Sequence, residues 1–119
     1  MFSKRKFLRV NILANIVIHD ILNDKYLQGA ITNISAGGLA ILINEPIEVG
    51  TPLSVTFEVE GYKKLQKISG DVVRVEKLTD KYYHGIAFYN LPKAQEEELE
   101  SYINSLYSKQ QRAVKRGRL

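Results

Sequence analysis

The feature that most constrains this chain is a strict alternation of apolar and polar side chains along residues 53–60. Every odd position there is apolar and every even position is polar, a period that puts the apolar residues on one face of a β-strand. Five further stretches have strand-like patterns and are separated by polar, glycine- or proline-containing turns: 10–19, 25–33, 39–43, 65–78 and 82–89. Gly29 is expected to form a β-bulge. Six short strands joined by turns indicate an antiparallel barrel or sandwich.

The pattern changes to a helical one after residue 91. Pro92 suits the first turn of a helix, and the carboxylates of residues 96–98 suit the positive end of a helix dipole. Apolar residues then recur at helical spacing: Leu99, Tyr102, Ile103, Leu106 and Tyr107. We expect one amphipathic helix that covers an open edge or mouth of the barrel.

Length and composition exclude several classes of protein. A chain of 119 residues with 45% apolar and 25% charged residues suits one globular domain with a single core. No apolar run is long enough to span a bilayer, and the basic start is not followed by the apolar part of a secretion signal, so we expect a cytoplasmic protein. Because there are no cysteines, disulfides, thiol catalysis and cysteine-ligated zinc are excluded. The histidines, His19 and His84, and the carboxylates show no catalytic or metal-binding spacing, so an enzyme is not expected.

The formal charge of +4 suggests an anionic partner, and the positive charge collects at the two ends of the chain. We therefore divide the chain into a flexible ligand-binding segment at 1–9, a barrel with its helix at 10–108, and a basic tail at 109–119 that is expected to be disordered.

Two short polar clusters offer the chemistry of a binding site. The first is Arg5-Lys6-Phe7-Leu8-Arg9, and the second is Asn33-Ile34-Ser35-Ala36-Gly37-Gly38. A guanidinium places two parallel donors on a phosphate or on the edge of a guanine. Asn33 and Ser35 are two residues apart on an extended segment, so their acceptors point to the same face. The two glycines are expected to turn the chain with positive φ and to let backbone amides approach an anion.

In their order and separation, an Arg-x-x-x-Arg followed by an (Asp/Asn)-x-Ser-x-x-Gly resembles the signature of the PilZ family, bacterial receptors for cyclic di-GMP. The resemblance extends from about residue 4 to about residue 107. It implies an all-β fold with one C-terminal helix, a six-stranded antiparallel β-barrel of the split-barrel type. It also implies cyclic di-GMP as the ligand, with no other cofactor, and the following site residues: Arg5, Arg9, Asn33, Ser35 and Gly38. Asn33 departs from the more common Asp and removes one negative acceptor for guanine.

Two further expectations concern the segment before the first strand. Because it is too polar to pack on a core, we expect it to be mobile without ligand and to fold over the barrel on binding, which passes a signal to a protein partner that the sequence does not name. In the family, the residue before the first arginine helps to decide whether one ligand or an intercalated pair binds. Lys4 occupies that position here, and the stoichiometry stays open.

Two other interpretations also stay open. One is a basic β-barrel that binds nucleic acid, which predicts a steep dependence of binding on salt. The second copy of the Arg-x-x-x-Arg spacing, at residues 112–116, is interpreted as solvated charge, and nucleic acid is the less expected partner. The other is a protein-interaction module with the PilZ fold and no ligand. The oligomeric state is also open.

Overall fold

The computed structural model describes residues 7–59, 61 and 64–116. Its elements are, in chain order, β1 (Arg9–Asp20), β2 (Lys25–Ser35), β3 (Gly38–Ile43), β4 (Pro52–Glu58), β5 (Lys64–Lys77), β6 (Tyr82–Phe88) and α1 (Lys93–Arg116). Each strand expected from the alternation is present, and its ends lie close to the expected ones.

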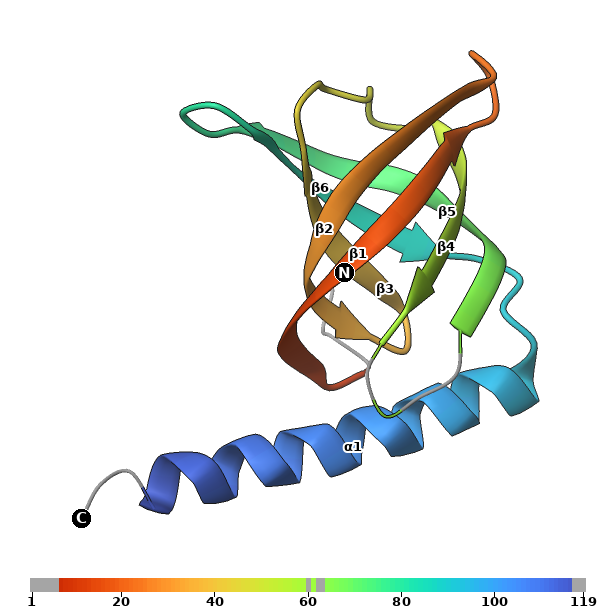
Figure 1. The fold of residues 1–119 in the computed structure, drawn as a ribbon. Helices are drawn as coiled ribbons and strands as arrows, with labels where there is room; N and C mark the ends of the chain where they lie inside the picture. The colour runs from red at the N-terminus through yellow and green to blue at the C-terminus, as the bar shows by residue number, and fades with distance from the viewer. Residues whose placement is uncertain (1–6, 60, 62–63, 117–119) are drawn as a thin grey trace, which may run out of the picture.

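The six strands form a closed barrel (Figure 1). Their order around the barrel is β1-β2-β3-β6-β5-β4, and every neighbouring pair is antiparallel. Closure is made by β1, which pairs with β2 on one side and with β4 on the other, so that Ile16 lies opposite both Gly29 and Phe57. The prediction of a six-stranded antiparallel barrel followed by one helix is therefore confirmed.

The interior of the barrel is filled by the apolar residues of the alternating pattern. In β4, Leu53, Val55 and Phe57 are each no more than 2% exposed, as the period of two requires. The largest side chains that are fully buried include, from the barrel strands, Ile16, Ile18, Ile31, Ile34, Leu39, Ile41, Leu53, Val55, Leu65 and His84. One continuous apolar core results, and His84 is the polar residue among these largest fully buried side chains.

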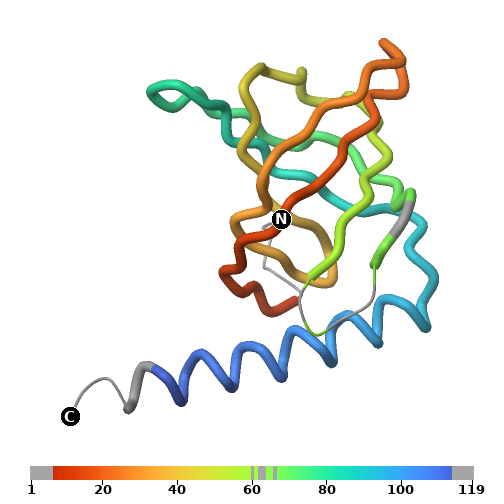
Figure 2. Tube along the Cα trace, viewed as in Figure 1, coloured from red at the N-terminus to blue at the C-terminus, as the bar shows by residue number. Residues whose placement is uncertain are grey.

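Helix α1 lies across one end of the barrel (Figures 1 and 2). Leu99 and Ile103 are each 1% exposed, and Tyr102 and Leu106 pack partly buried against the same core. Tyr107 is 39% exposed, so the apolar stripe that packs on the core is narrower than predicted. The expectation of a helix that covers a mouth of the barrel is confirmed.

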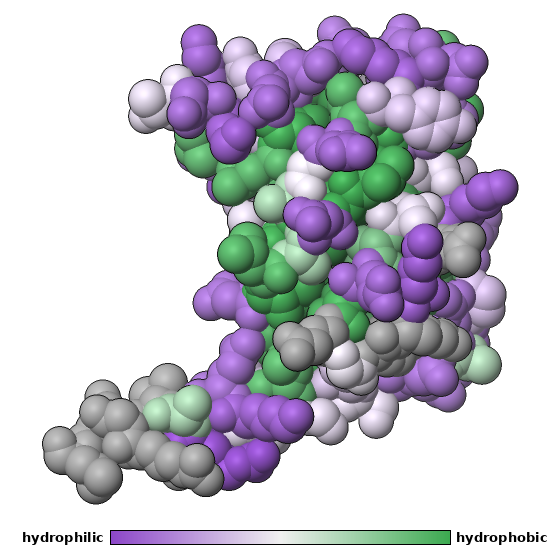
Figure 3. Space-filling view, in the orientation of Figure 1, coloured by the Kyte–Doolittle hydropathy of each residue, from purple (hydrophilic) through white to green (hydrophobic). Residues whose placement is uncertain are grey.

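The structure differs from the sequence-based division at the C-terminal end. Helix α1 continues to Arg116, through residues that the charge pattern had assigned to a basic tail. Lys, Gln, Arg and Ala dominate this stretch and are good helix formers, which explains why the helix does not stop where its apolar stripe ends. The helix projects beyond the barrel, and its residues 108–112 are polar, whereas apolar atoms show on the face of the barrel (Figures 1 and 3).

Gly29 has a different role from the one predicted. It pairs in regular register with Ile16, and the irregularity between β1 and β2 lies between Asn11 and Ala14, so the predicted bulge at Gly29 is wrong. A Cβ at Gly29 would lie 2.6 Å from the backbone oxygen of Leu42. Glycine is therefore required there because β2 and β3 approach each other closely.

Candidate ligand-binding site

The barrel brings the two polar clusters together at the start of β1. Arg9 is the first residue of β1 and lies opposite Ser35, the last residue of β2. From this position the Nη1 atom of Arg9 donates a hydrogen bond to Oδ1 of Asn33, a residue 24 positions away in the sequence. Of the five site residues predicted, Arg9, Asn33, Ser35 and Gly38 thus share one end of neighbouring strands. Arg5 lies outside the described residues, as does Lys4.

The Arg9–Asn33 pair has the right charge for an anionic ligand. Both side chains are partly buried, so the guanidinium is held close to the barrel surface. An amide oxygen accepts a hydrogen bond without neutralising the donor, whereas the more common aspartate would cancel the charge of the arginine. The pair therefore keeps a net positive charge, which favours binding of a phosphodiester.

Ser35 holds the turn between β2 and β3. It is only 4% exposed, and its Oγ accepts a hydrogen bond from the backbone N–H of Gly37 at 3.1 Å. The same hydroxyl donates to the carbonyl oxygen of Gly38 at 3.4 Å. A hydroxyl that binds the amide two residues further on stabilises a tight turn. In this structure Ser35 therefore shapes the backbone next to Asn33.

The expected positive φ at Gly37 and Gly38 is wrong. Among the described residues, the glycines with positive φ are Gly50 and Gly61. Gly38 is instead required by strand packing, because a Cβ there would lie 2.1 Å from the backbone oxygen of Ile86 on β6. The serine-based turn explains why the chain reverses at residues 36–37 without a left-handed glycine.

The segment before β1 contains two residues whose role the sequence analysis missed. Phe7 and Leu8 are partly buried and pack against the barrel core, so the expectation that this segment is too polar to pack on a core is wrong for both of them. The ring of Phe7 lies close to Gly37, where a Cβ would be 3.0 Å from its Cδ2 atom. Two consecutive apolar residues between two arginines were the signal for this contact.

Helix α1 reaches the same end of the barrel as the predicted site. The Nε2 atom of Gln110 donates a hydrogen bond of 2.8 Å to the backbone oxygen of Asn11. Asn11 lies two residues after Arg9 and pairs with Asn33 across the β1–β2 ladder. The second half of the helix is thus linked directly to the strand that carries Arg9 (Figure 2).

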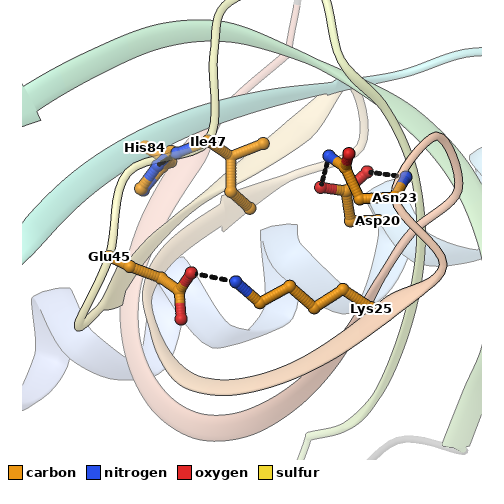
Figure 4. Close-up of polar contacts among 6 residues, drawn as sticks. All are labelled: Asp20, Asn23, Lys25, Glu45, Ile47 and His84. Atoms are coloured by element: carbon orange, nitrogen blue, oxygen red, sulfur yellow. Dashed lines mark hydrogen bonds and ion pairs between the residues drawn. The ribbon is translucent and has the colours of Figure 1, made fainter.

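A second group of polar contacts fastens the loops at the other end of the barrel (Figure 4). The carboxylate of Asp20, which is 5% exposed, accepts hydrogen bonds from the backbone and side chain of Asn23. The Lys25 ammonium pairs with the Glu45 carboxylate across the space between the β1–β2 turn and the β3–β4 loop. A cavity of about 370 Å³ lies there. The Asp20–Asn23 bonds hold the β1–β2 turn, and the Lys25–Glu45 pair joins it to the β3–β4 loop, at the opposite end of the β1–β2 ladder from Arg9.

His84 holds the β3–β4 loop from inside the barrel. Its Nε2 atom accepts a hydrogen bond of 2.9 Å from the backbone N–H of Ile47, and the residue is fully buried. Burial lowers the pKa of His84 because it disfavours the charged imidazolium, and the nearby backbone of Tyr82 acts in the opposite direction more weakly. The neutral imidazole is also the form that accepts the bond from Ile47. We therefore interpret His84 as a structural residue.

Across residues 7–59, 61 and 64–116, no three His, Asp or Glu side chains are grouped so that they would hold a metal ion. Within that same part of the chain, no helix combines the length and apolar character needed to cross a membrane.

The fold and the paired motifs together define a small six-stranded β-barrel domain whose Arg-x-x-x-Arg motif ends at the first residue of β1. The family model of the PilZ domain matches residues 3–105, and the chain belongs to the PilZ family. A search of curated proteins finds no match.

Solved structures of similar fold include three proteins from different bacteria. YcgR of Escherichia coli in complex with c-di-GMP has a TM-score of 0.81 and 14% identity, and the match covers 98% of this chain and 51% of that chain. The inhibitor of motility of Bacillus subtilis (MotI/DgrA) has a TM-score of 0.75 and 18% identity, covering 91% and 54%. The MrkH–c-di-GMP complex of K. pneumonia has a TM-score of 0.76 and 16% identity, covering 94% and 55%. At these identities the likeness shows the fold, and this chain spans about half the length of those three.

Proposed function

We propose that this chain is a receptor for cyclic di-GMP that changes its surface when the ligand binds and so signals to a protein partner. The observation that carries the proposal is the contact between Arg9 and Asn33, which joins the two motifs on neighbouring strands. Membership of the PilZ family and the likeness to two structures solved with c-di-GMP support it. The proposal includes a cytoplasmic location.

The ligand offers groups that match the proposed site. Cyclic di-GMP has two phosphodiester anions and two guanines, and guanidinium groups bind both kinds of group with paired donors. In the proposal, Arg5 and Arg9 bind these groups, and the oxygen of Asn33 accepts a hydrogen bond from guanine. Ser35 and Gly38 act by holding the β2–β3 turn in place beside them. In this contact Asn33 accepts the hydrogen bond without adding a negative charge beside the Arg9 guanidinium.

Signalling is proposed to pass through helix α1. Gln110 binds the backbone of Asn11, two residues from Arg9, so a ligand that moves Arg9 also perturbs this contact. The polar part of α1 at residues 108–112 is then the surface whose position changes. Hydrogen exchange with and without ligand measures this step. We expect altered protection of α1 around residue 110, and unchanged protection there would refute the signalling step while leaving binding intact.

Binding itself is tested by calorimetric titration. We expect wild-type protein to bind cyclic di-GMP and not GMP, cyclic di-AMP or single-stranded RNA. Because each charge-assisted hydrogen bond contributes about 1.5–3 kcal/mol, Arg5→Ala and Arg9→Ala should each weaken binding by about one to two orders of magnitude. Arg112→Ala is the matched control, since Arg112 begins the other Arg-x-x-x-Arg, is exposed on α1, and should leave affinity unchanged.

Two results would replace the proposal by one of the alternatives. Equal, strongly salt-dependent binding of RNA by wild type and by both arginine variants favours a nucleic-acid-binding barrel. Absence of any ligand binding by the folded wild type favours an interaction module.

A further inference from the structure

We propose that Phe7 is a positioning residue, whose ring docks on Gly37 and holds the arginine-bearing segment in the geometry that binds the ligand. This inference rests on the proposed function, since it names what places the arginines. It concerns two residues outside the predicted set of site residues.

The contact depends on the absence of a side chain at Gly37. A Cβ there would lie 3.0 Å from Cδ2 and 3.4 Å from Cε2 of the Phe7 ring. The first of these distances is tighter than an ordinary carbon–carbon contact, so a Cβ at position 37 would require the ring to shift by a few tenths of an ångström. Phe7 is also partly buried against the barrel core, which adds apolar contact to the docking.

The surface that receives the ring is fixed on both sides. The N–H of Gly37 donates to Oγ of Ser35 at 3.1 Å, and its carbonyl oxygen accepts a hydrogen bond of 2.9 Å from the N–H of Phe88 on β6. The turn is therefore bound to β2 and to β6 at once. Because the turn is held in this way, docking on Gly37 places Phe7 relative to the whole barrel.

Because of its position in the sequence, a docked Phe7 restricts the arginine that precedes it. Phe7 lies midway between Arg5 and Arg9. Arg9 has its own support, because it pairs with Ser35 and binds Asn33. Arg5 precedes Phe7 by two residues, a stretch of at most about 7 Å of chain, so docking of Phe7 limits the volume in which the Arg5 guanidinium can act. Restricting a binding group before the ligand arrives lowers the entropy cost of binding.

A double-mutant cycle on ligand affinity tests this placement. We expect Phe7→Ala to weaken cyclic di-GMP binding by about tenfold, the equivalent of about 1.4 kcal/mol, and Gly37→Ala to weaken it by less, because the ring is displaced but not removed. The double variant should be no weaker than Phe7→Ala alone, because a Cβ at residue 37 then meets no ring. Gly85→Ala is the matched control, since a Cβ there makes an ordinary contact of 3.4 Å with Arg74 and should leave affinity within about twofold. Multiplicative losses in the double variant, or wild-type affinity in Phe7→Ala, would overturn the proposal.

A second double-mutant cycle, of Phe7→Ala with Arg5→Ala, tests whether Phe7 acts by positioning Arg5 or only by packing on the barrel. If Phe7 acts through Arg5, the loss caused by Phe7→Ala should shrink to less than about threefold when Arg5→Ala is already present. A purely structural role would give the full loss in both backgrounds and would overturn the positioning role.

Failure of the proposed function is distinguishable from failure of this inference. If folded wild type does not bind cyclic di-GMP, the proposed function fails. The Phe7–Gly37 contact is then tested by urea unfolding of the wild type, Phe7→Ala, Gly37→Ala and the double variant. A smaller effect of Gly37→Ala on the unfolding free energy when Phe7 is absent supports the docking, and additive effects overturn it.

Discussion

Replacing Gly38 by alanine tests whether this glycine is required for ligand binding or for the packing of β3 against β6. In the family signature Gly38 belongs to the ligand-binding motif, whereas in the structure a Cβ at Gly38 would lie 2.1 Å from the backbone oxygen of Ile86 and 3.2 Å from Cα of Ala87. Both neighbours are backbone atoms of β6, which no rotamer change can move. We therefore expect Gly38→Ala to destabilise the fold.

The expected loss of unfolding free energy can be worked out from the separation of β3 and β6 that the alanine requires. To relieve this contact, β3 and β6 must separate by about 1 Å at the Gly38–Ala87 pair. The separation also disturbs the adjacent pair, Leu39 and Ile86, whose side chains belong to the core. Weakening one or two ladder hydrogen bonds costs about 1 kcal/mol each, and repacking an overfilled core costs about 1–3 kcal/mol. We expect a loss of about 3 kcal/mol and a fall in melting temperature of about 10 °C.

Urea and thermal unfolding followed by circular dichroism measure this loss. Gly85→Ala, on β6, is the control, because its Cβ would make only ordinary contacts and should cost less than about 1 kcal/mol. If Gly38→Ala is as stable as Gly85→Ala but has lost its ligand, the packing argument is refuted and Gly38 acts at the ligand instead.

Three other predictions concern the core and the far end of the barrel. Because the pKa of His84 is lowered in the folded state, its contribution to stability should be complete above about pH 6.5 and should be lost as pH falls through the folded-state pKa; urea unfolding across pH should show a shallower acid loss in His84→Gln. Ile103→Ala should cost about 2–4 kcal/mol of unfolding free energy, because the side chain is 1% exposed, and a cost below about 1 kcal/mol would show that α1 is not packed on the core. Lys25→Ala should change stability by no more than about 1 kcal/mol, since its ion pair with Glu45 is about half exposed, and a larger loss in thermal unfolding would contradict this.

Local patterns were sufficient for the elements of this fold. The alternation in residues 53–60 predicted the inward side chains of β4, and the helical spacing of Leu99 and Ile103 predicted the face of α1 that is buried. Both predictions depend only on the geometry of a strand or a helix, in which side-chain direction follows from residue number. The end of α1 was not predicted, because apolar spacing stops before a stretch of good helix formers does.

The candidate site was predictable in its residue types but not in its contacts. The motif implied five ligand-binding residues: Arg5, which lies outside the described residues, and Arg9, Asn33, Ser35 and Gly38. The structure adds that Ser35 binds the turn backbone and that Gly38 lies against β6. Sequence could not separate these roles, because a polar or small residue beside a turn has the same local pattern whether it meets a ligand, its own backbone or another strand.

By itself, the sequence determined where the strands and turns form and where the helix begins. It also determined that the chain has one core and that the basic residues of the chain collect at its two ends. The tertiary structure alone decided that β1 closes the barrel by pairing with β4, that Arg9 reaches Asn33, and that the ring of Phe7 rests on Gly37. The physical reason is the distance along the chain over which each feature is determined. Side-chain periodicity is a property of neighbouring residues, whereas the register between strands and the close approach of a ring to a glycine depend on the packing of the whole barrel.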